Sequence, residues 1–169
     1  MSAVLALFNR SRMEGNFTPL QRALDATPER GRDGSQLWQN DRVALAHQHF
    51  WITTEEQGEQ QPLHERDSNL TISADARLDN RDELFRLLGL KRDRAISDAA
   101  LIMLAYRNWA ERCVEYLRGD FAFVIWDGRH NRLYAARDVL GNRDLAYYAD
   151  ENICLITVLM GPPRHSGPR

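Results

Sequence analysis

The chain has 169 residues, of which 43% are hydrophobic and 9% aromatic, and this is enough for one globular domain with a buried core. Its 22 basic and 24 acidic residues give a net charge of -2 and form no block of one sign, which argues against nucleic acid and membrane partners. No apolar run reaches the roughly 20 residues of a membrane helix, and no signal peptide is recognisable, so we expect a cytoplasmic protein.

Apolar periodicity predicts strands and helices in a mixed order along the chain. Strands are expected at 4–8, 43–52 and 70–78, the last with strict alternation of apolar and polar residues. Helices are expected at 18–28, at 79–89 with Gly89 as its end, and at 97–119 with Ser97 as its start. Further strands are expected at 121–126, 132–137, 145–148 and 153–160. This order predicts an α+β domain rather than a parallel βαβ sheet.

The chain is expected to form one domain over residues 1–160. Residues 161–169 contain three prolines and two glycines and hardly any apolar side chains, so they are predicted to be a disordered tail. The strand expected at 153–160 is apolar on both of its faces. We expect this strand to be an exposed edge that promotes self-association.

Seven short segments occur in an order that resembles one known family. They are Arg30–Gly34, Leu45–His47, Gln61–Leu63, Asp79–Leu84, Ser97-Asp98, Gly119–Asp127 and Ala136–Gly141. Over roughly residues 3–150 the chain resembles the glutaminase domain of the asparagine synthase family. The resemblance implies a four-layer αββα sandwich, with two antiparallel sheets between helical layers. It also implies an N-terminal-nucleophile hydrolase, which releases ammonia from glutamine.

The resemblance places three residues at the catalytic positions of the family. Ser2 stands where the family has a cysteine that attacks glutamine and uses its own α-amino group as the base. Asp75 and Ala76 stand at the two oxyanion-hole positions, where the family has an asparagine and a glycine. An ionised Asp75 would bring a like charge to the oxyanion of the intermediate. Asp75 also fits an ordinary strand carboxylate that is solvated or paired with an arginine.

Three further residues stand at substrate-binding positions. His49 replaces the arginine that binds the glutamine carboxylate, and a neutral imidazole lacks the bidentate fork of a guanidinium. Arg77 replaces a glutamate, whereas Asp98 keeps the carboxylate that holds the glutamine amine, although it fits a helix cap equally well. We expect Asp75, Arg77, His49 and Asp98 to share one cleft. His47 lies on the same strand face as His49, but without a third ligand no metal site is predicted.

These replacements predict a degenerate glutaminase domain without glutamine hydrolysis. The segment Asp75–Leu84 is most similar to asparagine synthase-like proteins that modify peptides, such as lasso peptide cyclases. We therefore expect a scaffold that docks to an ATP-dependent synthetase or cyclase. No adenylate-binding loop occurs in the chain, so no cofactor is expected here, and ATP and Mg would belong to the partner. Two alternatives stay open, namely an active glutaminase that binds glutamine, and a truncated, non-functional fragment.

Overall fold

The computed structural model describes residues 2–11, 15–51 and 57–158, so the predicted tail at 161–169 lies outside the described residues. Its elements are β1 (Ala3–Asn9), α1 (Thr18–Asp25), the 3-10 helix η1 (Pro28–Arg30), β2 (Ser35–Gln39), β3 (Val43–Gln48), β4 (Leu63–Glu65), β5 (Leu70–Leu78), α2 (Arg81–Leu87), α3 (Asp98–Trp109), the 3-10 helix η2 (Ala110–Tyr116), β6 (Gly119–Asp127), β7 (Arg132–Arg137), β8 (Ala146–Ala149) and β9 (Ile153–Val158). Within these ranges no helix is long and apolar enough to cross a membrane.

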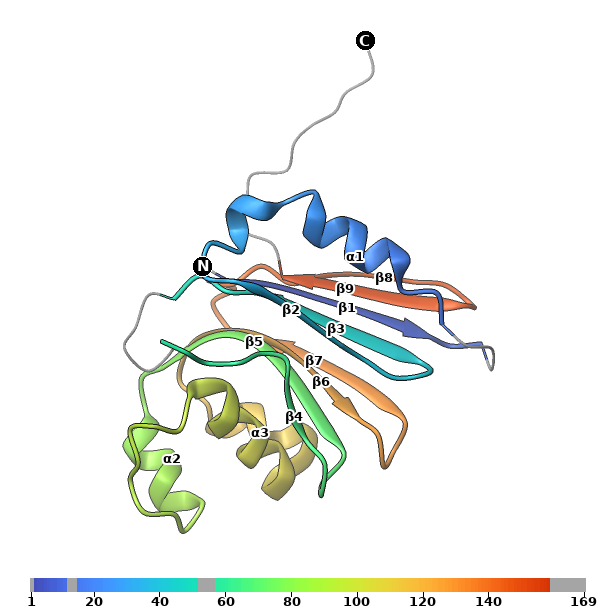
Figure 1. Ribbon diagram of the computed structural model, residues 1–169. Helices are drawn as coiled ribbons and strands as arrows, with labels where there is room; N and C mark the ends of the chain where they lie inside the picture. Colours follow the sequence, from blue (N-terminus) through green and yellow to red (C-terminus); the bar gives the residue numbers. More distant parts are fainter. Residues whose placement is uncertain (1, 12–14, 52–56, 159–169) are drawn as a thin grey trace.

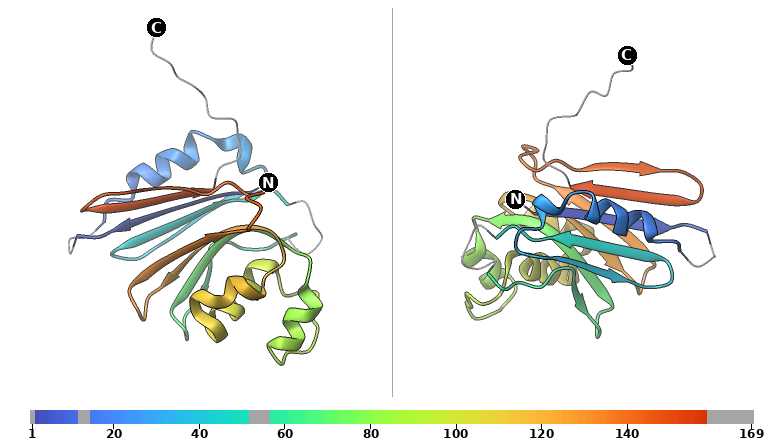
Figure 2. Two further views of the ribbon diagram at one scale, coloured as in Figure 1. Left: turned by 180° about the vertical axis from the view of Figure 1, so that it is seen from behind. Right: turned by 45° about the horizontal axis from the view of Figure 1, so that its top comes forward.

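Two antiparallel sheets pack face to face between helices (Figures 1 and 2), which confirms the predicted α+β class and the four-layer sandwich. Sheet A has the strand order β2-β3-β1-β9-β8, and sheet B has the order β4-β5-β6-β7. Figure 1 shows α1 over the outer face of sheet A, and α2 and α3 over the outer face of sheet B.

The last described strand does not lie at an edge of its sheet. β9 pairs with β1 on one side and with β8 on the other, so the expectation of an exposed edge strand at 153–160 is wrong. On this side of the sheet the edge is formed by β8, whose four residues are all exposed. The final residues of the expected strand, 159 and 160, lie outside the described part of the chain.

Alternation along the strands divides the core into layers. The layer between sheet B and its helices includes Leu101 and Ile102 of α3 and Phe123 and Ile125 of β6. The layer between the two sheets contains Val4, Ala6, Val43, Leu45, Ala122, Val124, Trp126, Ile156 and Val158. Since Ala74 and Ala76 belong to the helical layer, the intervening side chains of β5 point between the sheets. The space between the sheets therefore changes from apolar to polar toward Asp75.

The helix predicted at 97–119 is interrupted. Ser97 caps α3 as predicted, because its side chain accepts a hydrogen bond from the N–H of Ala100 at 3.2 Å. The α-helix ends at Trp109, since Ala110 has a φ of 51°, and the chain continues as η2. Trp109 stacks on Tyr116 with ring centroids 4.1 Å apart, so the bend is stabilised by an aromatic contact.

Candidate functional site

A narrow pocket near the start of β1 brings together four of the six predicted site residues. Ser2, Asp75, Ala76 and Asp98 all line it. The remaining lining residues are His47, Trp51, Glu59, Gln61, Ala74 and Ala99. The cavity measures only about 10 Å³, which is roughly the space that one water molecule requires. Protein side chains therefore fill nearly all of the predicted site.

Ser2 is held at the end of the pocket by the segment that follows β3. It precedes β1 directly, and alternation along that strand turns its side chain to the same inner face as Val4. Its Oγ accepts a hydrogen bond from the backbone N–H of Phe50 at 3.2 Å. The backbone N–H of His49 donates to the carbonyl oxygen of Gly34 at 2.8 Å, so the Arg30–Gly34 segment supports this end of β3.

Asp75 lies beside a cation that the sequence did not point to. The side chains of Asp75 and Arg143 are 7% and 13% exposed, and the Nε atom of Arg143 is 3.4 Å from Oδ2 of Asp75. Arg143 comes from the loop between β7 and β8, far from Asp75 in sequence. The sequence offered only a general reason to expect a cation near Asp75, namely that a buried carboxylate requires a partner. The geometry matches the arginine-paired strand carboxylate that the sequence left open.

Gln61 also shapes the pocket. Its side-chain Nε2 donates to the carbonyl oxygen of Ala74 at 3.1 Å, and its Oε1 accepts from the N–H of Ala74 at 2.7 Å. The side chain therefore pairs with β5 as a neighbouring strand would, just before the short strand β4. These two hydrogen bonds hold the Gln61–Leu63 segment against β5, the strand that carries Asp75.

Asp98 ties three elements together. It is the first residue of α3, but Ser97 supplies the helix cap. One carboxylate oxygen of Asp98 accepts from the N–H of Leu78 at 2.8 Å, and the other accepts from the guanidinium of Arg81. These bonds join α3 to the end of β5 and to α2. An amine that bound here would have to compete with Arg81 for the carboxylate.

Arg77 does not line the pocket, so the expectation of one shared cleft is wrong for this residue. Its side chain is 54% exposed and forms ion pairs with Asp79 at 3.4 Å and with Asp120 at 3.1 Å. Arg77 pairs with Asp120 near the end of the β5–β6 ladder. At that end the side chain reaches solvent, although it shares a strand face with Asp75.

Two histidines lie at the polar end of the space between the sheets. His47 is buried, and its Nδ1 is 2.9 Å from Oγ of Ser73. The ring of His49 lies 4.5 Å from that of His47, but His49 is not among the lining residues of the pocket. Burial and the adjacent His49 lower the pKa of His47 well below its usual value, and burial lowers the pKa of His49. Both rings are therefore neutral near pH 7 and lack the charge of the family's arginine.

Acid is expected to destabilise the protein below about pH 6.5, mainly because of His47, with a contribution of the same sign from His49. Folding lowers the pKa of this side chain, so the unfolded state binds more protons, and stability falls as the pH falls. The expected slope for one histidine is about 1.4 kcal/mol per pH unit. Urea unfolding from about pH 7.5 to about pH 5 measures it. His47→Gln should flatten the slope, and an unchanged slope in this variant would contradict the assignment.

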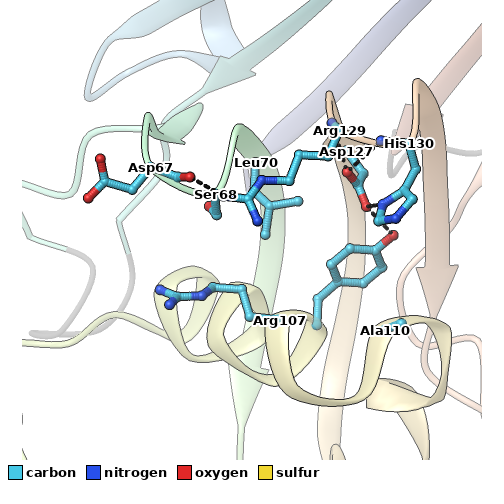
Figure 3. Close-up of a pocket in the computed structure, with 9 residues that line it drawn as sticks. Asp67, Ser68, Leu70, Arg107, Ala110, Asp127, Arg129 and His130 are labelled. Carbon is cyan, nitrogen blue, oxygen red and sulfur yellow. Dashed lines mark hydrogen bonds and ion pairs between the residues drawn. The ribbon is translucent and has the colours of Figure 1, made fainter.

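The described residues contain no group of three or more His, Cys, Asp or Glu side chains placed to hold a metal ion. A larger pocket, of about 450 Å³, lies at the opposite end of sheet B (Figure 3). There Asp127 accepts from the backbone N–H groups of Arg129 and His130 and lies 2.7 Å from Nδ1 of His130. Tyr106 donates to it at 3.3 Å, and burial together with Asp127 raises the pKa of Tyr106 to about 12. This network fastens the β6–β7 turn to α3.

A sandwich of this kind, with a pocket at the start of a central strand, is the fold of the N-terminal-nucleophile hydrolases. One similar solved structure is the glutamine phosphoribosylpyrophosphate amidotransferase from B. subtilis, complexed with ADP and GMP. The superposition has a TM-score of 0.71 and covers 92% of this chain and 41% of that chain. The sequence identity is 15%, so the likeness concerns the fold alone.

A family model described as a glutamine amidotransferase domain matches residues 1–158, and the chain therefore belongs to this family. The glutamine-hydrolyzing asparagine synthetase 3 of Bacillus subtilis (strain 168) is 33% identical over 133 residues, which cover 76% of this chain and 21% of that protein. The glutamine-hydrolyzing asparagine synthetase of Asparagus officinalis is 36% identical over 112 residues, which cover 66% of this chain and 19% of that protein. The chain thus spans about a fifth of the length of these relatives.

Proposed function

We propose that this chain is a glutamine amidotransferase domain that does not hydrolyse glutamine. The observation that carries the proposal is the buried pair of Asp75 and Arg143, since Asp75 stands at the position of the family's oxyanion-hole asparagine. An oxyanion hole stabilises the tetrahedral intermediate with hydrogen-bond donors, whereas a carboxylate offers acceptors and a like charge. Losing one such donor typically raises the barrier by about 2.7–4 kcal/mol.

The substrate-binding positions support the same proposal. A cavity of about 10 Å³ has no room for a glutamine side chain. The carboxylate of Asp98, which would hold the amine, already accepts from Arg81 and from the backbone of Leu78. His49 is neutral and cannot bind a carboxylate through two parallel hydrogen bonds as arginine does. Uptake of glutamine would therefore need several of these contacts to rearrange together.

We further propose that the domain is a scaffold for an ATP-dependent synthetase or cyclase. In the curated relatives this domain corresponds to about a fifth of a longer protein, and we extend that arrangement to a partner domain or protein. Within this proposal the partner modifies a peptide, as in the lasso peptide cyclases that the Asp75–Leu84 segment resembles. ATP and Mg would be bound by the partner, and the complex would work in the cytoplasm.

An active glutaminase is the second candidate, and the place of Ser2 favours it. Ser2 lines the same pocket as Asp98, which is the family's carboxylate for the substrate amine. A serine at the N-terminus could attack the amide while its own α-amino group removes the hydroxyl proton. Several relatives are named as glutamine-hydrolyzing enzymes. This candidate requires the hydroxyl to act without the family's oxyanion donors.

The purified protein is expected to release no glutamate from L-glutamine above the level of its Ser2→Ala variant. The physical reason is that the nucleophile, the oxyanion donor and the carboxylate-binding arginine are all replaced. A coupled glutamate dehydrogenase assay measures the release. Steady release that disappears in Ser2→Ala would contradict the loss of hydrolysis and establish the active glutaminase instead.

The scaffold role is tested separately with the ATP-dependent synthetase or cyclase encoded nearest to this chain's gene. Co-expression is expected to give a stable complex, and the partner's ATP-dependent activity should need the domain. Ser2→Ala should support that activity as well as the unchanged chain does, because a scaffold needs no nucleophile. Full partner activity in the absence of this domain would overturn the scaffold role, whatever the glutamine assay shows.

A further inference from the structure

The loop between β7 and β8 presents two adjacent apolar side chains to solvent. Val139 is 100% exposed and Leu140 is 84% exposed. A single exposed aliphatic residue is ordinary on a protein surface, but adjacent ones on an ordered loop are typical of a contact surface. We call this pair the 139–140 projection.

The loop that carries the projection is held in one shape by its own polar groups. Asp138 is buried, and its two carboxylate oxygens accept from the N–H groups of Asn142 at 3.0 Å and Arg143 at 3.1 Å. Its backbone N–H donates to Phe121 at 2.8 Å, and its carbonyl accepts from Gly141 at 3.1 Å. Because the loop is ordered before any partner arrives, a contact through it costs little conformational entropy.

An apolar groove of about 620 Å³ lies directly beside the projection. Val139 and Leu140 form part of its lining, and the rest comes from η2, the two residues between η2 and β6, β6, the end of β7 and Asp138. Its other apolar lining residues are Val114, Leu117, Phe121 and Ala136. A projecting pair and a hollow of the same apolar character therefore lie next to each other. In an isologous contact, a two-fold rotation would place each projection against the groove of the other copy.

The charges at the two ends of the loop fit the same arrangement. Arg137 precedes the loop and Asp144 ends it, and both side chains are exposed. Among the described residues neither takes part in an ion pair. A two-fold axis that passes between them brings Arg137 of one copy toward Asp144 of the other, and it does so twice. Opposite charges then face each other on both sides of the axis.

We propose that two copies of this chain associate through this surface, each inserting its 139–140 projection into the groove of the other. The association does not depend on whether glutamine is hydrolysed. The same loop carries Arg143, whose guanidinium lies beside Asp75 in the candidate site. The loop between β7 and β8 therefore forms the contact between copies and also supplies the arginine beside Asp75.

Sedimentation velocity of the full chain over a hundredfold range of concentration tests the proposal. The unchanged protein is expected to show a monomer–dimer equilibrium, and Leu140→Asp should sediment as a monomer with an unchanged circular dichroism spectrum. Leu90→Asp is the matched control, because Leu90 is a 40% exposed leucine outside this surface, and it should dimerise normally. A monomeric unchanged protein, or dimerisation that persists in Leu140→Asp, would overturn the proposal.

A charge exchange gives a second measurement of the same contact. Arg137→Asp and Asp144→Arg should each weaken dimerisation about three- to tenfold, because each puts like charges opposite one another twice. The double variant Arg137→Asp/Asp144→Arg should restore the dissociation constant of the unchanged protein. A double variant that dimerises as weakly as the single variants would overturn the two-fold arrangement.

Discussion

Replacing Arg143 with methionine is expected to lower the free energy of unfolding by about 3–5 kcal/mol, because it removes the guanidinium that lies beside the buried carboxylate of Asp75. Both side chains are largely shielded from water, so solvent cannot take over the role of the guanidinium. Methionine retains much of the arginine's apolar packing, and the loss therefore reports the charge. Urea unfolding at neutral pH measures it.

Two further variants separate charge from packing. Asp75→Asn in the Arg143→Met background removes the buried negative charge and should recover a large part of the lost stability. Arg107→Met is the matched surface control, since Arg107 pairs with Glu65 at 2.8 Å with both side chains substantially exposed, and its loss should cost less than about 1 kcal/mol. Equal losses for the surface pair and the Asp75 pair would show that Asp75 is not a buried charge.

Gly119→Ala is expected to destabilise the protein by about 3 kcal/mol or more, through strain and overlap together. Gly119 has a φ of 135°, which side chains rarely tolerate, and a Cβ there would lie 2.0 Å from the carbonyl oxygen of Arg77. That oxygen belongs to the backbone of β5, so relief requires a shift at the end of the β5–β6 ladder. Thermal and urea unfolding measure the cost.

Gly89→Ala serves as the control for the backbone strain alone. Gly89 has a φ of 68°, and a Cβ there would meet nothing within 4 Å. The expected cost is about 1–2 kcal/mol, which is the usual penalty for a left-handed residue with a side chain. If both substitutions lower the stability by the same amount, the overlap at Gly119 would add nothing to the loss. The two strands would then move apart easily at this point.

The longer elements could be predicted from local pattern, whereas the short ones could not. β5 spans Leu70–Leu78 as predicted, because each of its apolar residues alternates with a polar one. β2 and β4 were not predicted, since Ser35–Gln39 is mostly polar and Leu63–Glu65 has three residues. These two strands are stabilised by pairing with β3 and β5, which no local pattern reports. The break after Trp109 likewise has no signal in the residues around it.

The candidate site was predictable only in part. Short segments in the right order were enough to predict that Ser2, Asp75 and Asp98 share one pocket, because Ser2 and Asp98 lie at the starts of β1 and α3 and Asp75 lies within the long strand β5. Alternation gives the face on which Arg77 lies, but it does not tell how far the opposing sheet extends over that face. Arg143 was missed because an ion pair between a strand and a distant loop leaves no pattern in either segment.

The pairing of β1 with β9 has a consequence for biosynthesis. Sheet B is built from one continuous stretch of chain, β4 to β7, and can assemble as soon as that stretch has left the ribosome. Sheet A joins the first described strand to the last, from Val4 opposite Val158 to Asn9 opposite Ile153. β3 can pair with β1 early, but the edge of β1 that faces β9 must stay unpaired until nearly all of the described chain has been made. This interval makes β1 the strand most open to wrong pairing in the nascent protein.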